Sequence, residues 1–363
     1  MFNKFTLSIS SLAALLLFSP LSAEEAVKKD LPTKSPINEQ NDPNPSSEIA
    51  SIDIGSLKDS TQPFSAPSGK DAFSVPQPTL QTPYKSPTVA TALSTILPGL
   101  GHLYLEEYST AAALFGTVSA SAVAAADPFD ANTSTEGIIV ANQSYTYGIY
   151  AAYRDARIFN GLDTYRYKMP VDSFSDLAYA AFSPSVLKKP TVWGGIVGGL
   201  TLAYVVTRIG YGETCLSPIA NAPAANDIFS NNPSPLFPLT AFSVGIGEES
   251  FFRGYLQSAI IEETNPAVGI ALSSIFFGAA HIPNADVLDP QDRWRYYSFS
   301  VPLITALGTY FGILTYNSGS LQESVAVHSW YDFILFAATL ADARNNPEAS
   351  LRIPQTFALN LPF

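Results

Sequence analysis

Residues 247–254 read GEESFFRG and place two adjacent acids and an arginine within an apolar stretch, 237–261. A charged residue near the centre of a membrane helix costs about 2.5 to 3.5 kcal/mol on insertion scales, so such residues indicate a function. Glu249 and Arg253 are spaced i,i+4, share one helix face and can form an ion pair. Glu248 projects about 100° away from them and is available for chemistry. The competing interpretation is an ion pair that only fixes helix packing at a membrane interface.

Three more polar residues lie in apolar stretches of the second half of the chain. His281 ends the stretch 266–281, and His328 and Asp332 lie four residues apart within 321–340. The i,i+4 spacing places these last two on one helix face, where imidazole and carboxylate can share a water or a metal. Taken alone, a histidine at a helix end is more often structural, and the other pair fits a hydrogen bond that fixes helix packing.

Together, these polar residues supply what peptide hydrolysis requires. Ionisable groups on membrane helices normally face the interior of a bundle and mark a functional site. A carboxylate can act as a general base for water, and positive charge can stabilise the developing oxyanion. The predicted catalytic residues are Glu248, Glu249, Arg253, His281, His328 and Asp332.

The composition of the 363-residue chain is that of a membrane protein. Only 14% of its residues are charged, against roughly 25% in an average soluble domain. From residue 89 onward apolar stretches recur, and several are near the roughly 20 residues that cross a bilayer. We predict an all-α, polytopic transmembrane helical bundle with about eight membrane helices. The expected stretches are 89–105, 110–126, 137–153, 191–207, 237–261, 266–281, 297–316 and 321–340.

The N-terminal part of the chain differs from the rest. Lys4, the apolar run 7–18 and the small residue Ala23 form the pattern of a signal peptide over 1–23. An uncleaved membrane anchor is the alternative. Residues 24–88 hold ten of the 28 prolines and no apolar run, so they cannot bury enough surface to offset their ordering entropy. We expect a disordered, exported linker there.

The charge of the chain limits its partners and suggests an orientation. A net charge of -12 argues against a nucleic-acid partner, which requires a basic face. The single cysteine, Cys215, excludes an internal disulfide. A basic loop between the third and fourth stretches predicts a cytoplasmic side there, with both chain ends outside. Its charges are Arg154, Arg157, Arg166, Lys168, Lys188 and Lys189.

The order and spacing of the motifs resemble the CPBP family of intramembrane proteases, also called the type II CAAX prenyl endopeptidase, Abi or bacteriocin-processing family. The runs 308–312 and 318–321 also resemble the family's stretch before its last histidine. The resemblance covers about residues 190–342 and implies a helical membrane bundle with the site inside it. The family pattern EExxxR, FxxxH and HxxxN/D appears here as Glu248-Glu249-xxx-Arg253, Phe277-xxx-His281 and His328-xxx-Asp332.

The resemblance also implies roles for the site residues and a division into domains. Glu248 would activate water, helped by His281. Glu249 and Arg253 would hold the site helix in place. The implied domains are N-terminal membrane helices at 89–170, a protease domain at 171–345 and a tail at 346–363.

The last histidine motif raises the question of a metal. His328 and Asp332 would complete the site, but Asp332 stands where many relatives have Asn. An ionised aspartate cannot donate a hydrogen bond to an oxyanion, whereas it is a good metal ligand. The sequence therefore favours a divalent metal, with zinc the expected ion, and a metal-free site with a protonated Asp332 is the alternative. The possible metal ligands are Glu248, His281, His328 and Asp332.

These inferences predict an intramembrane (metallo)endopeptidase that hydrolyses a peptide bond of a membrane-associated protein or peptide. Its other partner is the lipid bilayer, and the signal pattern predicts the bacterial inner membrane, with the linker exported. One alternative is a non-catalytic membrane scaffold or immunity-type factor on the same fold. A transporter with buried Glu and His as a proton relay is the least favoured alternative.

The third histidine of the chain is left out of the predicted site. His102 lies in the run 97–104, LPGLGHLY, which resembles a hairpin of small bacterial two-helix membrane proteins. The proline and the two glycines of this run predict a turn or a re-entrant bend rather than a ligand site.

Overall fold

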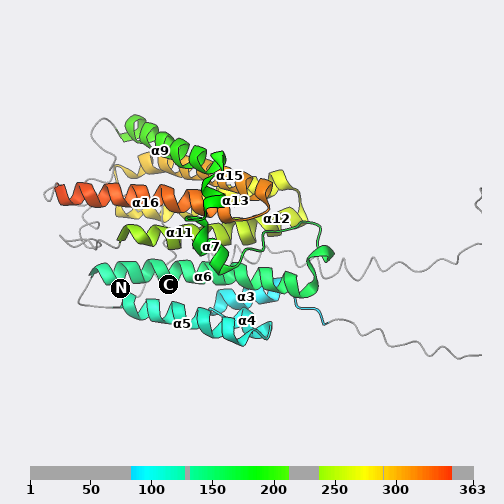
Figure 1. Cartoon of the computed structure of the whole chain (residues 1–363). Helices are drawn as coiled ribbons and strands as arrows, with labels where there is room; N and C mark the ends of the chain where they lie inside the picture. The colour runs from blue at the N-terminus through cyan, green and yellow to red at the C-terminus, as the bar shows by residue number, and fades with distance from the viewer. Residues whose placement is uncertain (1–82, 127–130, 212–236, 289, 346–363) are drawn as a thin grey trace, which may run out of the picture. The chain divides into compact units, whose positions relative to one another are not determined.

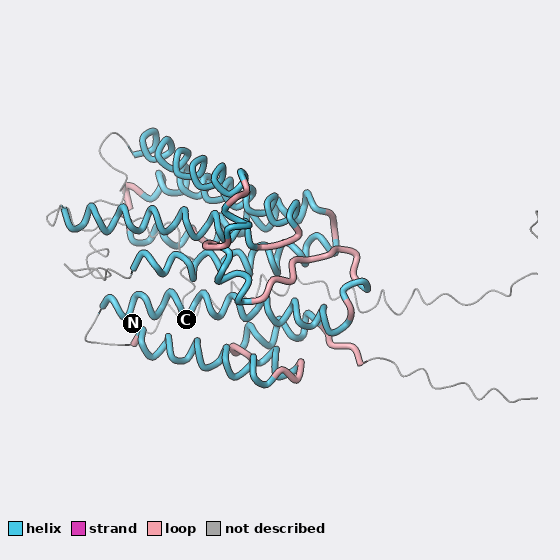
Figure 2. The backbone as a smooth tube through the Cα atoms, in the orientation of Figure 1, coloured by secondary structure: helices cyan, strands magenta, loops and turns pink. Residues whose placement is uncertain are grey.

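The computed structural model describes residues 83–126, 131–211, 237–288 and 290–345, all within one compact unit. The predicted signal peptide, residues 24–82 of the predicted linker and the tail 346–363 lie outside the described residues. The last residues of the predicted linker, 83–88, are described, and helix α3 already begins at Pro87. Every element in the described part of the chain is a helix, which confirms the all-α class (Figure 2).

The described part is a bundle of long helices with short helices between them (Figure 1). Long single helices are α5 (Tyr108–Ala125), α6 (Ala131–Asn160), α9 (Pro190–Tyr211), α13 (Pro266–Ala280), α15 (Val301–Ser318) and α16 (Gln322–Asn345). One more long helix runs without a break through α11 (Thr240–Glu249), the π-helical η4 (Ser250–Gln257) and α12 (Ser258–Glu263). The short elements are α3 (Pro87–Ile96), α4 (Leu100–Tyr104), η2 (Leu162–Thr164), α7 (Phe174–Ala180), α8 (Pro184–Leu187), η3 (Phe237–Leu239), η5 (Ile282–Val287), α14 (Arg293–Arg295) and the π-helical η6 (Tyr296–Ser300).

Two tight turns set the antiparallel order of the helices that carry the predicted site. Asn265 caps α13 by accepting a hydrogen bond from the Val268 amide at 3.1 Å, and Pro266 follows it at the start of the helix. Gly319 ends α15 in the left-handed conformation, with φ 68°, which favours glycine at this position. The pairs α12–α13 and α15–α16 are therefore neighbours that run in opposite directions.

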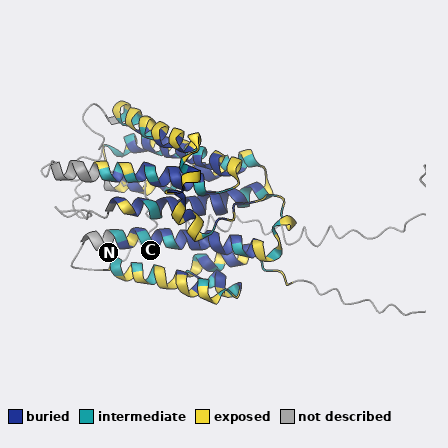
Figure 3. Ribbon diagram, in the orientation of Figure 1, coloured by how far each residue is buried: buried dark blue, intermediate teal, exposed yellow. Residues whose placement is uncertain are grey.

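Four of the described helical segments are long and apolar enough to cross a membrane. The outer helices also expose apolar side chains (Figure 3): on α9, Trp193, Val197 and Ile209 are each more than half exposed. Such a surface is typical of contact with lipid, so the chain has the character of a membrane protein. The number of about eight membrane helices stays a prediction. The four segments are Tyr108–Ala125, Pro190–Gly210, Pro266–Asp286 and Arg293–Ser318.

The first predicted stretch, 89–105, is not one spanning helix. It is divided into α3 and α4, which have 10 and 5 residues. These helices rise about 15 and 8 Å, well short of the roughly 30 Å hydrocarbon core. The break lies at Leu97, Pro98 and Gly99, and Gly99 has φ 84°. The turn predicted from the proline and glycines of this run is therefore confirmed.

The basic region formed by the end of α6 and the loop after it is tied to the second half of the chain by buried polar contacts. Arg157 is fully buried, and its Nη2 lies 3.1 Å from Glu262 Oε2 at the end of α12. The backbone amides of Arg166 and Tyr167 donate to the same carboxylate, each at 2.9 Å. Some of the basic residues that predicted a cytoplasmic side thus stabilise the packing of helices. The orientation of the bundle stays a prediction.

Two hydrophobic clusters flank the helices of the predicted site. One packs α6 against η4 and α13 and includes Tyr150 and Phe277. The other packs α9 against α15 and α16 and includes Phe311 and Tyr331. The site residues are therefore enclosed between two apolar cores, where burial removes them from water.

We expect Asp172→Ala to destabilise the fold, because this carboxylate joins the loop before α7 to the start of α16. It accepts hydrogen bonds from Ser320 Oγ at 2.7 Å, the Leu321 amide at 2.8 Å and Gln322 Nε2 at 3.1 Å. Loss of charged hydrogen bonds costs about 1 to 3 kcal/mol, which a lower Tm of the detergent-solubilised protein would report. Asp163→Ala is the control, since its side chain is 94% exposed. An equal fall of Tm in both variants would contradict this role of Asp172.

Candidate active site

Three helices approach one another closely at the segment that carries the two predicted acids. Gly245 and Gly247 lie in α11 just before Glu248. A Cβ on Gly245 would lie 2.3 Å from Ser329 Oγ of α16, and a Cβ on Gly247 would lie 2.3 Å from Gln143 Oε1 of α6. Small residues thus let both neighbouring helices pack against α11, as is typical of helices in membranes.

The site helix changes from α to π directly after Glu249. Ser250–Gln257 form the π-helical element η4, which the sequence did not predict. Single π-helical turns are rare and occur frequently at functional sites. Arg253 lies in this element, and its Nη1 donates to Glu249 Oε1 at 3.0 Å. The predicted ion pair between these two residues is therefore present.

Glu248 and His281 face each other because they lie at equal distances from one turn. Thr264 and Asn265 connect α12 to α13, 16 residues after Glu248 and 16 residues before His281. In antiparallel helices, equal distances from the turn bring two residues to the same level. Glu248 Oε2 accordingly lies 3.9 Å from His281 Nε2. The position of His281 at a helix end therefore does not remove it from the site.

The imidazole of His281 is held in one tautomer. Its Nδ1 lies 2.7 Å from Phe277 O, and because a carbonyl oxygen only accepts, Nδ1 carries the proton. In the neutral ring, Nε2 then keeps a lone pair on the side of Glu248. A separation of 3.9 Å is too long for a direct hydrogen bond, but a water about 2.8 Å from each atom would bridge it.

His328 lies among three carboxylates. Its Nδ1 lies 2.8 Å from Glu249 Oε1. Its Nε2 lies 3.4 Å from Asp332 Oδ2 and 3.9 Å from Glu248 Oε2. The histidine therefore connects the carboxylates of α11 to Asp332, which lies one turn further along α16.

All six predicted site residues come together in the bundle interior. Each has at most 3% of its surface exposed. A cavity of about 10 Å³ adjoins His281, His328 and Asp332, which is about the room that one water molecule needs. Its other walls are apolar or aromatic: Phe277, Ile304, Leu307, Phe311 and Tyr331.

Aromatic rings enclose the cation and the last histidine of the site. Phe311 stacks on His328 with ring centroids 5.1 Å apart and planes at 18°. The Arg253 guanidinium lies 4.2 Å from the Phe277 ring centroid and 5.4 Å from that of Phe311, an arrangement that stabilises a cation away from water. Neither phenylalanine was predicted as a site residue. In the sequence, Phe277 is the first residue of the FxxxH motif, and Phe311 lies in the run 308–312.

The predicted metal ligands do not form a compact set. One zinc ion needs ligand atoms that are all close to one another, because its bonds are about 2.0 to 2.2 Å long. Within the described part of the chain, no three of these four residues bring one ligand atom each within 4.8 Å of one another. The donor types suit zinc, but this geometry does not fit a single ion. The four residues are Glu248, His281, His328 and Asp332.

Residues 230–334 match a protein-family model described as Type II CAAX prenyl endopeptidase Rce1-like. The matched segment contains all six site residues and the run 308–312. Comparison with curated proteins gave no match, and comparison with solved structures gave none either. The matched segment is thus similar to a family of membrane-embedded proteases. This segment belongs to the CPBP or CAAX protease family, which confirms the resemblance seen in the sequence.

We expect Gly308→Ala to disturb the site from the neighbouring helix α15. A Cβ at Gly308 would lie 2.8 Å from Arg253 Nη2 and 2.9 Å from Phe277 Cδ1. Overpacking of a buried position costs about 1 to 3 kcal/mol, which a lower Tm would report. Gly198→Ala of α9 is the control, because its added Cβ meets no described atom within 4 Å and alanine favours a helix. Equal Tm values for the two variants would contradict a tight fit around Arg253.

Proposed function

We propose that the chain is an intramembrane endopeptidase in which Glu248 activates a water molecule for attack on a peptide bond. The observation that carries this proposal is the position of Glu248 Oε2, 3.9 Å from Nε2 of His281 and 3.9 Å from Nε2 of His328. Both gaps suit a water that bridges a carboxylate and an imidazole. The match to a protease family supports the same chemistry.

Glu248 acts as the general base in this proposal. Its carboxylate removes a proton from the water while the water oxygen attacks the peptide carbonyl carbon. The same carboxyl then gives a proton to the leaving amine. His281 orients the water, because its Nε2 can accept a hydrogen bond while Nδ1 is held by Phe277 O. The surrounding bundle keeps bulk water away, which strengthens these interactions.

His328 supplies positive charge for the tetrahedral intermediate. When both ring nitrogens are protonated, Nδ1 donates to Glu249 Oε1, and Nε2 would donate to the oxygen of the reacting carbonyl. Asp332, with Oδ2 3.4 Å from Nε2, balances that charge as an ionised carboxylate. It acts through His328 as a positioning residue, and it need not donate a hydrogen bond itself. This role accounts for an aspartate where many relatives have asparagine.

No step of this proposal passes through a metal. The open spacing of the four predicted ligands does not fit one zinc ion. Glu248 and His281 provide the base and the orientation of water, and His328 provides the charge for the oxyanion. These residues therefore contain the groups that hydrolysis requires.

We propose a membrane-associated protein or peptide as the substrate and the bacterial inner membrane as the location. The apolar helices and the exposed apolar face of α9 support a membrane setting. An apolar substrate segment could reach the buried site between helices without crossing water. The exported linker rests on the N-terminal sequence alone.

Glu248→Gln should abolish peptide cleavage while the protein stays folded. The full chain is reconstituted in lipid vesicles and tested on a set of lipid-anchored fluorogenic peptides, with and without a prenyl group. Removal of a general base lowers the rate by about 10² to 10⁴-fold. Asp286→Asn is the control, because this carboxylate follows His281 in the chain but its side chain is 70% exposed. We expect the control to keep the wild-type rate.

The same assay separates a protease from a non-catalytic scaffold. A scaffold would show no cleavage by folded wild-type protein, or a cleavage rate that Glu248→Gln does not change. Either result would contradict the proposed hydrolysis. A preference for the prenylated peptides would in addition define the substrate class.

A further inference from the structure

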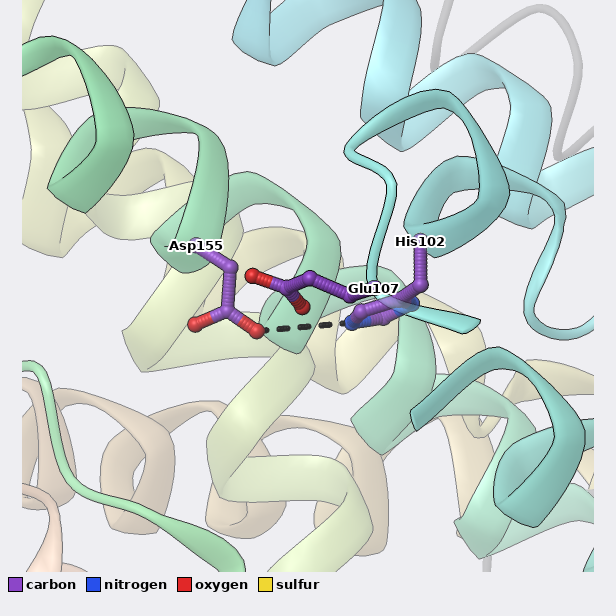
Figure 4. Close-up of side chains that lie close together, drawn as sticks. All are labelled: His102, Glu107 and Asp155. Atoms are coloured by element: carbon purple, nitrogen blue, oxygen red, sulfur yellow. Dashed lines mark ion pairs between the residues drawn. The ribbon is translucent and has the colours of Figure 1, made fainter. Parts of the chain in front are cut away.

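A second polar cluster lies outside the protease site, where α4 and α5 pack against α6. His102 belongs to α4, Glu107 precedes α5, and Asp155 lies near the end of α6. Figure 4 shows the three side chains pointing toward one another. The sequence interpretation had assigned only a turn to this region, and the cluster lies before the segment 230–334 that matches the protease family.

Close packing of α4 brings His102 against α6. A Cβ on Gly101 would lie 2.1 Å from Ala90 O of α3 and 3.0 Å from Ala152 Cβ of α6. Only glycine fits there, so the helix lies directly on its two neighbours and buries His102 completely. The amide of Glu107 donates to His102 O at 2.8 Å. This turn of the backbone brings Glu107 close to His102 just before α5 begins.

The imidazole of His102 is buried without a hydrogen bond. None of its surface is exposed, and neither ring nitrogen has a hydrogen-bond partner among the residues that the structure describes. Its Nε2 lies 3.4 Å from Asp155 Oδ2, an ion-pair contact. Buried polar groups in proteins are nearly always satisfied by the protein, by water or by an ion. No ordinary hydrogen bond thus satisfies the ring, and an ion at Nε2 would take the place of its long contact with Asp155.

The three residues offer donors that fit one metal ion. One ligand atom from each of His102, Glu107 and Asp155 lies within 4.8 Å of the other two. Two ligands on a tetrahedral zinc ion are about 3.3 to 3.5 Å apart, given bonds of about 2.0 to 2.2 Å. The 3.4 Å between His102 Nε2 and Asp155 Oδ2 has this length. A nitrogen with two carboxylates suits zinc, whereas calcium prefers oxygen ligands alone.

The charges around the cluster favour a cation. Arg154 holds the Asp155 carboxylate through hydrogen bonds of 2.7 and 3.0 Å, and hydrogen bonds of this kind orient metal-binding carboxylates. Arg154 balances one carboxylate, so the charge of Glu107 remains. A cation between the two carboxylates would balance this remaining negative charge.

We propose that His102, Glu107 and Asp155 bind a zinc ion that fastens α4 and α5 to α6. Glu107 and Asp155 are partly exposed, so the ion can enter from the surface and a water can complete its coordination. The proposed zinc site is distant from the protease site. Gln143 of α6 packs beside Gly247 in the protease site, and Asp155 lies 12 residues further along α6, a rise of about 18 Å.

Zinc content of the full chain tests this proposal. The detergent-purified protein is stripped with a chelator, dialysed against zinc and analysed by mass spectrometry of the metal. The background is the double variant His281→Gln/His328→Gln, so that the protease residues contribute no zinc. We expect about one zinc ion per chain, lost with His102→Gln and with Asp155→Asn. The control Glu106→Gln should keep the ion, since this neighbouring carboxylate is paired with Lys85 at 2.7 Å and 68% exposed.

Two results would overturn the proposal. One is equal zinc content in the His102→Gln and Glu106→Gln variants, and the other is no zinc bound by the folded background protein. The cluster would then be an ion pair that only fixes the hairpin. If His102→Gln does not fold, the zinc content of Glu107→Gln is compared with that of Glu106→Gln instead. The Glu107→Gln variant leaves the buried imidazole in place. Peptide cleavage does not enter this readout, so failure of the proposed protease activity would leave the result unaffected.

Discussion

The oxygen Oε1 of Glu249 accepts two hydrogen bonds inside the bundle, from Arg253 at 3.0 Å and from His328 at 2.8 Å. Buried charge is stable only where opposite charge and hydrogen bonds compensate the loss of water. Because Arg253 lies on η4 and His328 on α16, this shared oxygen fixes the position of one helix against the other. It also leaves Glu248, the preceding residue of α11, directed toward His281.

Close helix packing makes this arrangement possible. Gly247 lets α6 pack against α11, and Gly308 leaves room for the guanidinium of Arg253 on the side of α15. Helix α6 therefore packs against the helix that carries Glu248, although α6 lies outside the matched family segment. Contacts that hold α6, such as the buried pair of Arg157 and Glu262, connect the N-terminal helices to the geometry of the site.

The helical class and the grouping of the six polar residues could be predicted because their signals are local. Apolar stretches and the i,i+4 spacing of Glu249 with Arg253 and of His328 with Asp332 follow from helix periodicity. The π-helical form of Ser250–Gln257 could not be predicted, because its backbone pattern depends on tertiary packing rather than on residue types. The stacking of Phe311 on His328 likewise depends on how α15 lies against α16.

Predictions that depended on partners distant in the sequence were less complete. The basic residues between the third and fourth stretches suggested an orientation, but Arg157 lies in α6 and is buried against Glu262, 105 residues away. The stretch 89–105 was counted as one membrane span, although the turn predicted from its own proline and glycines divides it into α3 and α4. His102 was left out of the predicted site because its run predicted only a turn. Its partner Asp155 lies on another helix, and no local pattern joins the two.

The claim that Glu248 and His281 act on one water is tested most directly by a double-mutant cycle on kcat/KM. The variants are Glu248→Gln, His281→Gln and the double variant, compared on a peptide that the wild-type protein cleaves. Residues that act as a unit show strongly non-additive losses. The double variant is therefore expected to be scarcely slower than Glu248→Gln alone. Losses that multiply would show that the two residues act independently, and would contradict a shared water.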